Sequence, residues 1–267
     1  MFSGLLTRYV NLDFLSTHHI INRIAYDHIF SRGRFFRKRL ARKREQFPSL
    51  ESIQNFSGYE GPDGGWLRGE TKESEHTFNP VSEQGHALEA VSTQYQELVQ
   101  SLRNGDARGS ARNAAYLSHY VVDALDPAHH IGQHSAKHPV YNWEDPYLLS
   151  GAPFLYNFPK RHMWFEFRSA CFLYWQQKRY ALRRFHIPRR RTDVAHILRA
   201  FKRRVRHVHR LNIYEKFFHK DLHVTAKQHI LRVMFPMMIT SVSHFWLSAL
   251  FQTRRLRRRS NSNISLL

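Results

Sequence analysis

The chain has 267 residues, 42% of them hydrophobic, which is long and apolar enough for a single domain with a buried core. It carries 41 lysines and arginines against 21 acidic residues, a formal charge of +20, which predicts attraction to polyanions. Cys171 is the only cysteine, which excludes an internal disulfide framework and a cysteine-based zinc finger. Any bound metal would therefore need nitrogen and oxygen ligands.

Apolar residues at intervals of three and four predict a first helix over residues 15–45, ending in a run of arginines and lysines. Residues 47–84 are rich in glycine and proline and predict a long loop region, which in a compact domain is usually functional or disordered. A helix over 85–103 follows. Asn104-Gly105 then signals a stop, before a second helix that carries His119 and Asp123.

The second half of the chain also predicts helices. Residues 126–161 are rich in proline, histidine and tyrosine and predict irregular structure. Helices over 162–184, 192–212 and 219–252 follow, the last one kinked at Pro236. Because no alternating strand pattern or internal repeat is visible, the sequence predicts an all-α, single-domain multi-helix bundle over residues 1–252. The arginine-rich segment 253–267 predicts a disordered tail.

Targeting signals are not visible in the sequence. Residues 1–14 lack the pattern of a secretory signal peptide, and the most apolar run, 233–251, is interrupted by Pro236 and His244, which favours a buried helix over a membrane span. We therefore expect a cytoplasmic location by default, with peripheral membrane association as a further possibility.

The most specific motif is His119-x3-Asp123-x3-Pro127-x-His129. His119 and Asp123 are one helical turn apart, so they project from the same face. Pro127 ends the helix, which allows the chain to bring His129 back toward this pair. Imidazoles and a carboxylate that converge on one point suit Zn²⁺. Alone, the helical pair would equally be typical of a surface ion pair, so the assignment depends on the residues around it.

The motif resembles that of the zinc-dependent phospholipase C family, which shares its all-helical fold with the fungal single-strand-specific zinc nucleases. Upstream, Asp63 in Gly-Pro-Asp-Gly-Gly and His76 in His-Thr-Phe-Asn-Pro are similar to a zinc-binding Asp and His of that family. Alone, they would be a turn residue and a loop histidine. An early helix with Thr17-His18-His19-Ile-Ile-Asn22-Arg23 and Asp27 also looks like the family's first helix. The likeness covers about residues 15–145 and the last helix.

The resemblance implies two or three Zn²⁺ ions. The first site would use Asp63, His76, His119 and Asp123, and Asp63 could double as general base. The second would use His129 and His138 with a carboxylate. The third would share Asp123 as a bridge and add His18, with His19 as the alternative.

Two departures from the family pattern affect these sites. Asn142 in His138-Pro-Val-Tyr-Asn142 stands where the family's second site has a glutamate, and Glu144 or Asp145 could supply that carboxylate instead. His134 also forms a His-x3-His pair with His138. The family's third site uses an N-terminal tryptophan, and this chain has none before residue 66, which predicts an altered or empty third site.

From this resemblance we expect a metal-dependent phosphodiester hydrolase most like phospholipase C, which would cleave phospholipid head groups through a zinc-activated water. The high positive charge favours a single-strand nuclease of the same fold as an alternative. Asn142 and the missing tryptophan favour another, a non-catalytic lipid- or polyanion-binding protein with a degraded zinc site.

Segment 178–210 is a basic helical insert without a family counterpart. It would bind an anionic membrane surface or the phosphates of a nucleic acid. The same arginines are also typical of a solvated helix face, where the aliphatic parts of their side chains cover apolar surface. The aromatic residues that precede it, between Phe165 and Tyr180, have helical spacing and predict core packing.

Overall fold

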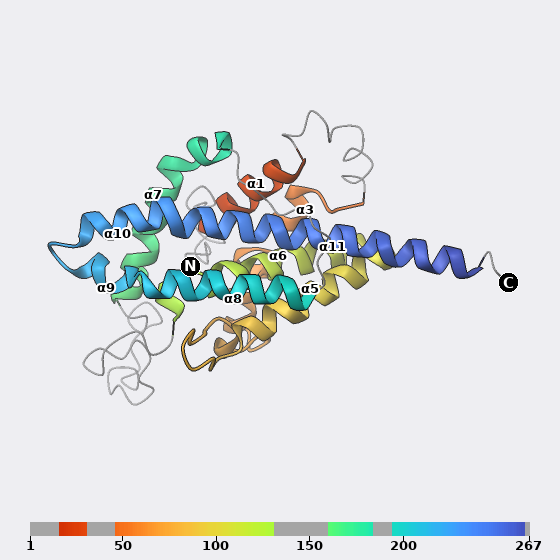
Figure 1. Cartoon of the computed structure of the whole chain (residues 1–267), viewed down its shortest axis with the longest axis horizontal. Helices are drawn as coiled ribbons and strands as arrows, with labels where there is room; N and C mark the ends of the chain where they lie inside the picture. The colour runs from red at the N-terminus through yellow and green to blue at the C-terminus, as the bar shows by residue number, and fades with distance from the viewer. Residues whose placement is uncertain (1–15, 31–45, 131–159, 184–193, 265–267) are drawn as a thin grey trace.

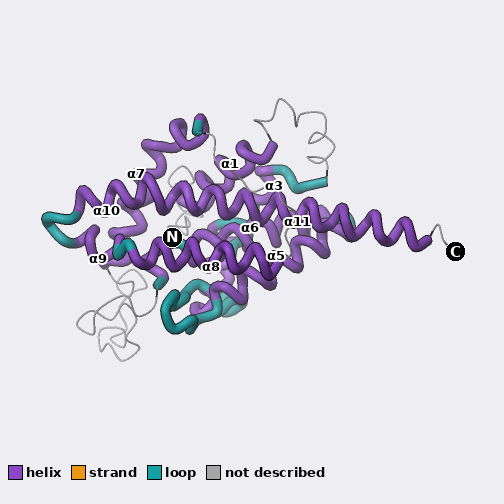
Figure 2. Tube along the Cα trace, viewed as in Figure 1, coloured by secondary structure: helices purple, strands orange, loops and turns teal. Residues whose placement is uncertain are grey.

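The computed structural model describes residues 16–30, 46–130, 160–183 and 194–264. Within these ranges the protein is all-α, as predicted, and its only extended pairing is an isolated parallel bridge between Phe78 and His130. Helices account for most of the described chain (Figure 2). In chain order the elements are α1 (Thr17–Phe30), α3 (Leu50–Gln54), η3 (Gly58–Glu60), α4 (Pro62–Leu67), η4 (Glu73–Glu75), α5 (Ala87–Asn104), α6 (Ala107–Ala124), η5 (Pro127–His129), α7 (Lys160–Leu182), α8 (Val194–Arg210), α9 (Ile213–Phe218), α10 (His223–His229), the π-helical turn η7 (Ile230–Met234) and α11 (Phe235–Ile264).

Helix α6 lies at the centre of the molecule and is buried along most of its length. Gly105 ends α5 in the left-handed conformation (φ 74°), and the Asp106 side chain then caps α6 by accepting a hydrogen bond from the Gly109 backbone N–H. This tight connection packs α5 directly against α6. Helices α1, α3 and α11 also pack against α6, and Trp246 of α11 donates a hydrogen bond to the Ala114 carbonyl at 3.0 Å.

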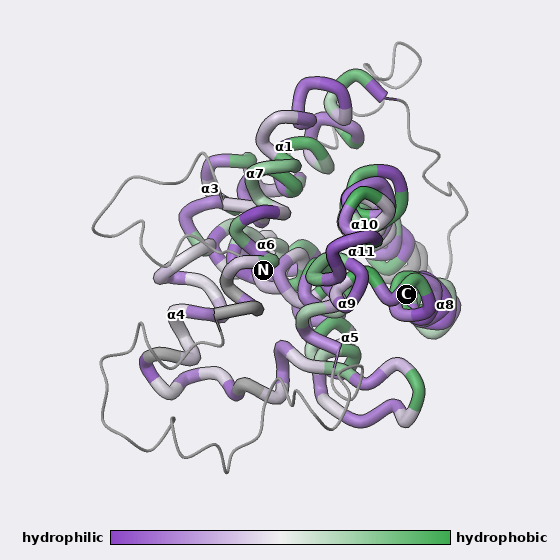
Figure 3. The backbone as a smooth tube through the Cα atoms, turned by 90° about the vertical axis from the view of Figure 1, so that its left-hand side faces the viewer, coloured by the Kyte–Doolittle hydropathy of each residue, from purple (hydrophilic) through white to green (hydrophobic). Residues whose placement is uncertain are grey.

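Helices α10 and α11 form one long rod across the molecule, with α8 beside it (Figure 1). Seen end-on, α8 carries both hydrophobic and hydrophilic positions around its axis (Figure 3). Its apolar residues Ile197, Phe201, Val205 and Val208 are buried. Just before Pro236, where the sequence predicts a kink, the structure has the π-helical turn η7. A proline has no N–H to donate to the preceding turn, and a widened turn accommodates that missing hydrogen bond.

The rod contains the stretch His223–Leu256, which by length and composition alone would be able to cross a membrane. However, 78% of its most apolar window is buried inside the protein. Burial of this kind is typical of a core helix, in agreement with the prediction for residues 233–251.

Two predictions about secondary structure were wrong. Residues 47–84 are not one long loop, because α3, η3, α4 and η4 lie there. The predicted disordered tail from Thr253 is helical through Ile264. Arginine has a high helix propensity, and Thr253 itself is buried and donates a hydrogen bond to the Val99 carbonyl at 3.3 Å, which attaches the start of this segment to α5.

Candidate metal centre

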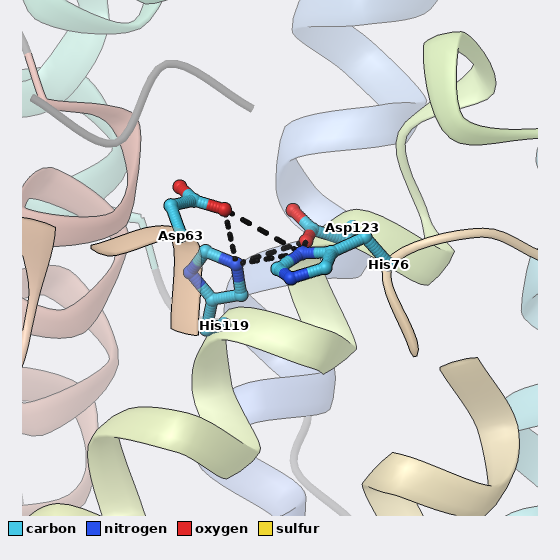
Figure 4. A group of neighbouring side chains, drawn as sticks. All are labelled: Asp63, His76, His119 and Asp123. Atoms are coloured by element: carbon cyan, nitrogen blue, oxygen red, sulfur yellow. Dashed lines mark hydrogen bonds and ion pairs between the residues drawn. The ribbon is translucent and has the colours of Figure 1, made fainter. Parts of the chain in front are cut away.

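Four side chains from three segments meet at the centre of the protein: Asp63 from α4, His76 from the loop after η4, and His119 and Asp123 from α6. We call them the first cluster (Figure 4). His119 Nε2 lies 3.0 Å from Asp123 Oδ2, 3.1 Å from Asp63 Oδ1 and 3.2 Å from His76 Nδ1. His76 Nδ1 lies 2.8 Å from Asp123 Oδ2 and 3.5 Å from Asp63 Oδ1. The structure thus brings together all four residues predicted for the first site.

The spacing of these four atoms suits a tetrahedral metal. Zn²⁺ binds imidazole nitrogen and carboxylate oxygen at about 2.0–2.2 Å, so neighbouring ligand atoms in a tetrahedron are about 3.3 Å apart. The measured distances of 2.8–3.5 Å lie around this value. Two nitrogens and two oxygens, from three buried residues and the partly buried Asp63, can therefore hold a metal ion with little movement. The second Asp63 oxygen points away from the group (Figure 4).

A close backbone approach positions Asp63. Pro62 occupies the first turn of α4, where the missing N–H has no cost. At Gly64 a Cβ atom would lie 1.7 Å from the Tyr59 carbonyl oxygen, so only glycine fits there. The glycine-rich phrase that predicted a loop thus allows a short helix that aims Asp63 at α6.

The carboxylate of Asp123 faces two directions. Its Oδ2 atom belongs to the first cluster, whereas Oδ1 lies 4.0 Å from His129 Nε2 and 3.7 Å from His18 Nε2. Asp123 is fully buried, so these imidazoles and the first cluster share one carboxylate in a closed environment. A carboxylate in this position can bridge two cations.

A second group that can hold a metal consists of His129, His162 and Glu166, which we call the second cluster. Glu166 Oε1 lies 2.8 Å from His162 Nε2 and 3.2 Å from His129 Nε2. His129 comes from η5, where Pro127 ends α6 as predicted, and the other two lie one turn apart on α7. All three are buried, and three protein ligands leave a coordination position open.

The second cluster differs from the predicted one. His138, Asn142 and Glu144, and their alternatives His134 and Asp145, lie outside the described residues. Sequence reasoning missed His162 and Glu166, although His162-Met-Trp-Phe-Glu166 has the same H-x3-E spacing that was sought at residue 138. This pair lies among aromatic residues whose helical spacing predicts core packing, so its spacing alone does not mark it as a metal site.

His18 lies beside both clusters. Its ring stacks on His119 with a centroid distance of 4.2 Å, and neither of its buried ring nitrogens has a hydrogen-bond partner among the described residues. Ser118 of α6 donates a hydrogen bond to Asn22 of α1, which fixes this part of α1 against α6. Of the two predicted alternatives, His18 and His19, it is His18 that approaches Asp123.

The electrostatics of the first cluster are those of a buried ion pair network. Burial lowers the pKa of His119, but the Asp123 and Asp63 carboxylates outweigh burial and raise this pKa to about 10. Burial would raise the pKa of Asp63 and of Asp123, but His119 holds both pKa values below their usual range. Burial and the charge of His119 lower the pKa of His18, which keeps His18 neutral. Without a metal, the first cluster therefore holds a proton at neutral pH on His119.

The second cluster behaves similarly. Burial raises the pKa of Glu166, yet interactions that include those with His162 and His129 outweigh burial and hold this pKa well below its usual value. Burial lowers the pKa of His162, but Glu166 outweighs burial and raises it. The carboxylates of Asp63 in the first cluster and Glu166 in the second are thus both ionised at neutral pH, as metal ligands must be.

Tyr120 supports the first cluster from the side. Its ring packs edge-on against His76 and His119 at centroid distances of 5.5 and 5.7 Å. Its hydroxyl donates a hydrogen bond to Glu75 Oε2 at 2.9 Å. This pair ties η4, and so the loop that carries His76, to α6.

Comparison of the chain with models of protein families and with curated proteins found no match. The resemblance to zinc-dependent phospholipases C therefore stays a prediction from motifs.

Proposed function

We propose that this protein is a metal-dependent phosphodiester hydrolase, with Zn²⁺ as its metal and a phospholipid as its most fitting substrate. The observation that carries the proposal is the position of Asp123. One of its oxygens belongs to the first cluster. The other lies 4.0 Å from Nε2 of His129, which is a member of the second cluster. Two neighbouring dication sites that share a carboxylate suit the hydrolysis of phosphate diesters.

Divalent cations bound at such a pair of sites polarise a phosphoryl oxygen, lower the pKa of a water and stabilise the oxygen of the leaving group. The protein's own residues would hold and orient the reactants. Asp63 is the most exposed carboxylate of the first cluster, with 18% of its side chain accessible, and one of its oxygens points away from the other ligands (Figure 4). We therefore assign Asp63 the role of accepting a proton from the attacking water.

The second cluster weakens one argument for the non-catalytic alternative. That alternative rested partly on Asn142, a neutral residue at the position expected for a carboxylate. Glu166 offers a buried carboxylate to His129 and His162 instead. A complete set of ligands for a second cation is thus present without any contribution from Asn142.

A single-strand nuclease is the second candidate, and the exposed basic side of α8 supports it. Arg199, Arg203 and Arg210 are exposed there, opposite the buried apolar side of the helix. Such a row of arginines could follow a phosphate backbone by releasing its counterions. Lys202 and Arg206 contribute less, because both form ion pairs with Glu83.

The test starts from protein stripped by a chelator and reloaded with Zn²⁺. Hydrolysis of phosphatidylcholine, single-stranded DNA and a small chromogenic phosphodiester is then measured side by side, with Asp123→Asn as the inactive reference. We expect zinc-dependent hydrolysis, fastest with the phospholipid. Faster hydrolysis of single-stranded DNA than of the phospholipid would instead support the single-strand nuclease. Saturated zinc binding without turnover of any of the three would instead establish the non-catalytic alternative.

A further inference from the structure

Helix α7 exposes large apolar side chains along one face. Trp175 and Leu182 are 79% and 75% exposed, and Trp164 and Phe167 are 51% and 39% exposed. The prediction that the aromatic residues of this segment pack in the core thus holds for Phe165 and Tyr180 but was wrong for Phe167 and Trp175. Burying large apolar groups is favourable, so several of them exposed on one helix indicate a contact surface.

The exposed residues share one side of the helix. Trp164, Trp175 and Leu182 follow one another at intervals of eleven and seven residues, which return to nearly the same side of an α-helix. The residues of α7 that face the interior include His162 and Glu166 of the second cluster. Helix α7 therefore offers ligands for a metal on one side and a group of exposed large apolar side chains, which we call the α7 outer face, on the other.

Cations border this face. The Arg168 guanidinium lies over the rings of Trp164 and Phe172, at 5.5 and 5.6 Å from their centroids. Lys227 Nζ of α10 lies 5.1 Å from the centroid of the same Phe172 ring. Lys178 and Arg179 are exposed between Trp175 and Leu182. The only acidic residue of α7 is Glu166, which is buried in the second cluster.

We propose that the α7 outer face docks on the surface of an anionic lipid bilayer. Tryptophan and phenylalanine rings beside arginine and lysine are the composition of helices that lie in the membrane interface, where the rings sit among head groups and the cations pair with anionic lipids. A second copy of this chain is a poorer occupant, because pairing two such faces would bring two rows of cations together. In this proposal the protein meets its phospholipid substrate at a bilayer surface, and in that respect it rests on the proposed function. Docking itself requires no metal.

The test measures partition of the full chain onto vesicles of phosphatidylcholine with and without phosphatidylserine, by co-sedimentation. We expect binding that requires phosphatidylserine and weakens with salt. The double variant Trp175→Ala/Leu182→Ala should bind about tenfold less, since two apolar side chains no longer enter the interface. The single variant Trp175→Phe should retain most of the binding. Both sites are solvent-exposed and distant in sequence from His162 and Glu166, so these variants should fold normally, which circular dichroism checks.

A matched pair of charge variants separates the α7 outer face from the general positive charge. Lys178→Gln/Arg179→Gln removes two exposed cations of α7, and Arg199→Gln/Arg203→Gln removes two exposed cations of α8. We expect the α7 pair to weaken vesicle binding about tenfold and the α8 pair to have a much smaller effect. Equal loss in the two pairs, or unchanged binding of Trp175→Ala/Leu182→Ala, overturns the proposal. So does a dimer in solution that the apolar double variant converts to a monomer, because the face would then be a contact between copies.

Failure of the docking proposal differs from failure of the proposed function. Vesicle binding is measured on chelator-treated protein, where no metal-dependent reaction occurs, and hydrolysis is measured with a small soluble phosphodiester, which needs no bilayer. Trp175→Ala/Leu182→Ala should leave hydrolysis of the soluble substrate unchanged and lower that of vesicle phospholipid. Normal docking with no hydrolysis of either substrate would reject the proposed function alone.

Discussion

Asp123 Oδ2 lies 3.0 Å from His119 Nε2, one helical turn earlier on α6, and the same oxygen lies 2.8 Å from His76 Nδ1. A pair that on a surface helix would contribute only a few tenths of a kcal/mol is here completely buried and joined by ligands from other segments. Burying a carboxylate among imidazoles is costly unless its charge is balanced, and a divalent cation balances it. The pair therefore belongs to a group of side chains that could hold a metal ion, rather than serving mainly to stabilise the helix.

Replacing Asp123 by asparagine should affect both clusters at once. The amide keeps the size of the side chain but loses the charge and the ability to bridge with two oxygens. We expect the metal content to fall by more than one equivalent and hydrolysis to fall on the order of a thousandfold. Metal analysis by mass spectrometry after gel filtration measures the first effect. Glu97→Gln, an exposed carboxylate of α5, is the matched control and should retain full metal content. A fully loaded Asp123→Asn protein would contradict the bridging role.

The second cluster makes a separable prediction. His162→Gln should remove one equivalent of bound metal and leave the other in place, because the first cluster uses no residue of α7. His196→Gln, an exposed histidine of α8, is the matched control, and we expect no loss of metal from it. Isothermal titration with Zn²⁺ gives the stoichiometry of each variant. Full metal content in His162→Gln would contradict a metal-binding role of the second cluster.

The sequence predicted the first cluster in full because each of its ligands lies in a distinctive local phrase. Asp63 lies between proline and glycines that permit the close approach of α4 to Tyr59, and His119 and Asp123 obey helical spacing. His162 and Glu166 have equally regular spacing but lie inside an aromatic-rich helix. Nothing local distinguishes a buried H-x3-E pair there from an ordinary core helix, and only the packing of α7 against η5 brings the pair to His129.

The fold class followed from periodicity, whereas two local features did not. Segment 47–84 contains short helices because the packing of α3 against α6 and of η4 against α5 stabilises turns that glycine and proline would weaken in isolation. Beyond Thr253, high arginine content suggested disorder, but propensity and the attachment of Thr253 to α5 continue the helix. In both places tertiary contacts decide what composition alone leaves open.

Metal binding at the first cluster should release protons. In the metal-free protein the pKa of His119 is about 10, so at pH 7.5 its imidazole is protonated between two carboxylates. A cation can bind its Nε2 only after that proton leaves. We expect about one proton to be released from His119 per ion bound at the first cluster, and affinity for Zn²⁺ to fall as pH is lowered below this pKa. Calorimetric titration in buffers of different ionisation enthalpy counts the protons. A binding enthalpy independent of the buffer would contradict a protonated His119.

Gly64 provides a test of how Asp63 is positioned. An added Cβ would meet the Tyr59 carbonyl oxygen at 1.7 Å, so Gly64→Ala must displace α4 from η3. We expect a loss of stability of about 1–3 kcal/mol and weaker metal binding, because Asp63 moves with α4. Gly65→Ala is the matched control, since its Cβ would meet only side-chain atoms, of Thr71 at 3.1 Å and of Glu70 at 3.7 Å. Chemical denaturation and zinc titration of both variants check this. Equal effects of the two substitutions would rule out the backbone contact as the cause.

His244 of α11 should make the fold sensitive to acid independently of the metal centre. Burial and the nearby charge of Arg204 lower the pKa of His244 to about 4 in the folded protein, whereas an unfolded chain has the ordinary histidine value of about 6.5. Between these values the unfolded state binds a proton that the folded state does not. Stability is therefore complete above pH 6.5 and falls as pH drops toward 4, by about 3 kcal/mol from this group. Urea unfolding at pH 7.5 and pH 4.5, with chelator present, measures the decrease. His244→Leu should show a decrease smaller by about 2–3 kcal/mol, and an identical decrease in the two proteins would assign the acid sensitivity to other histidines.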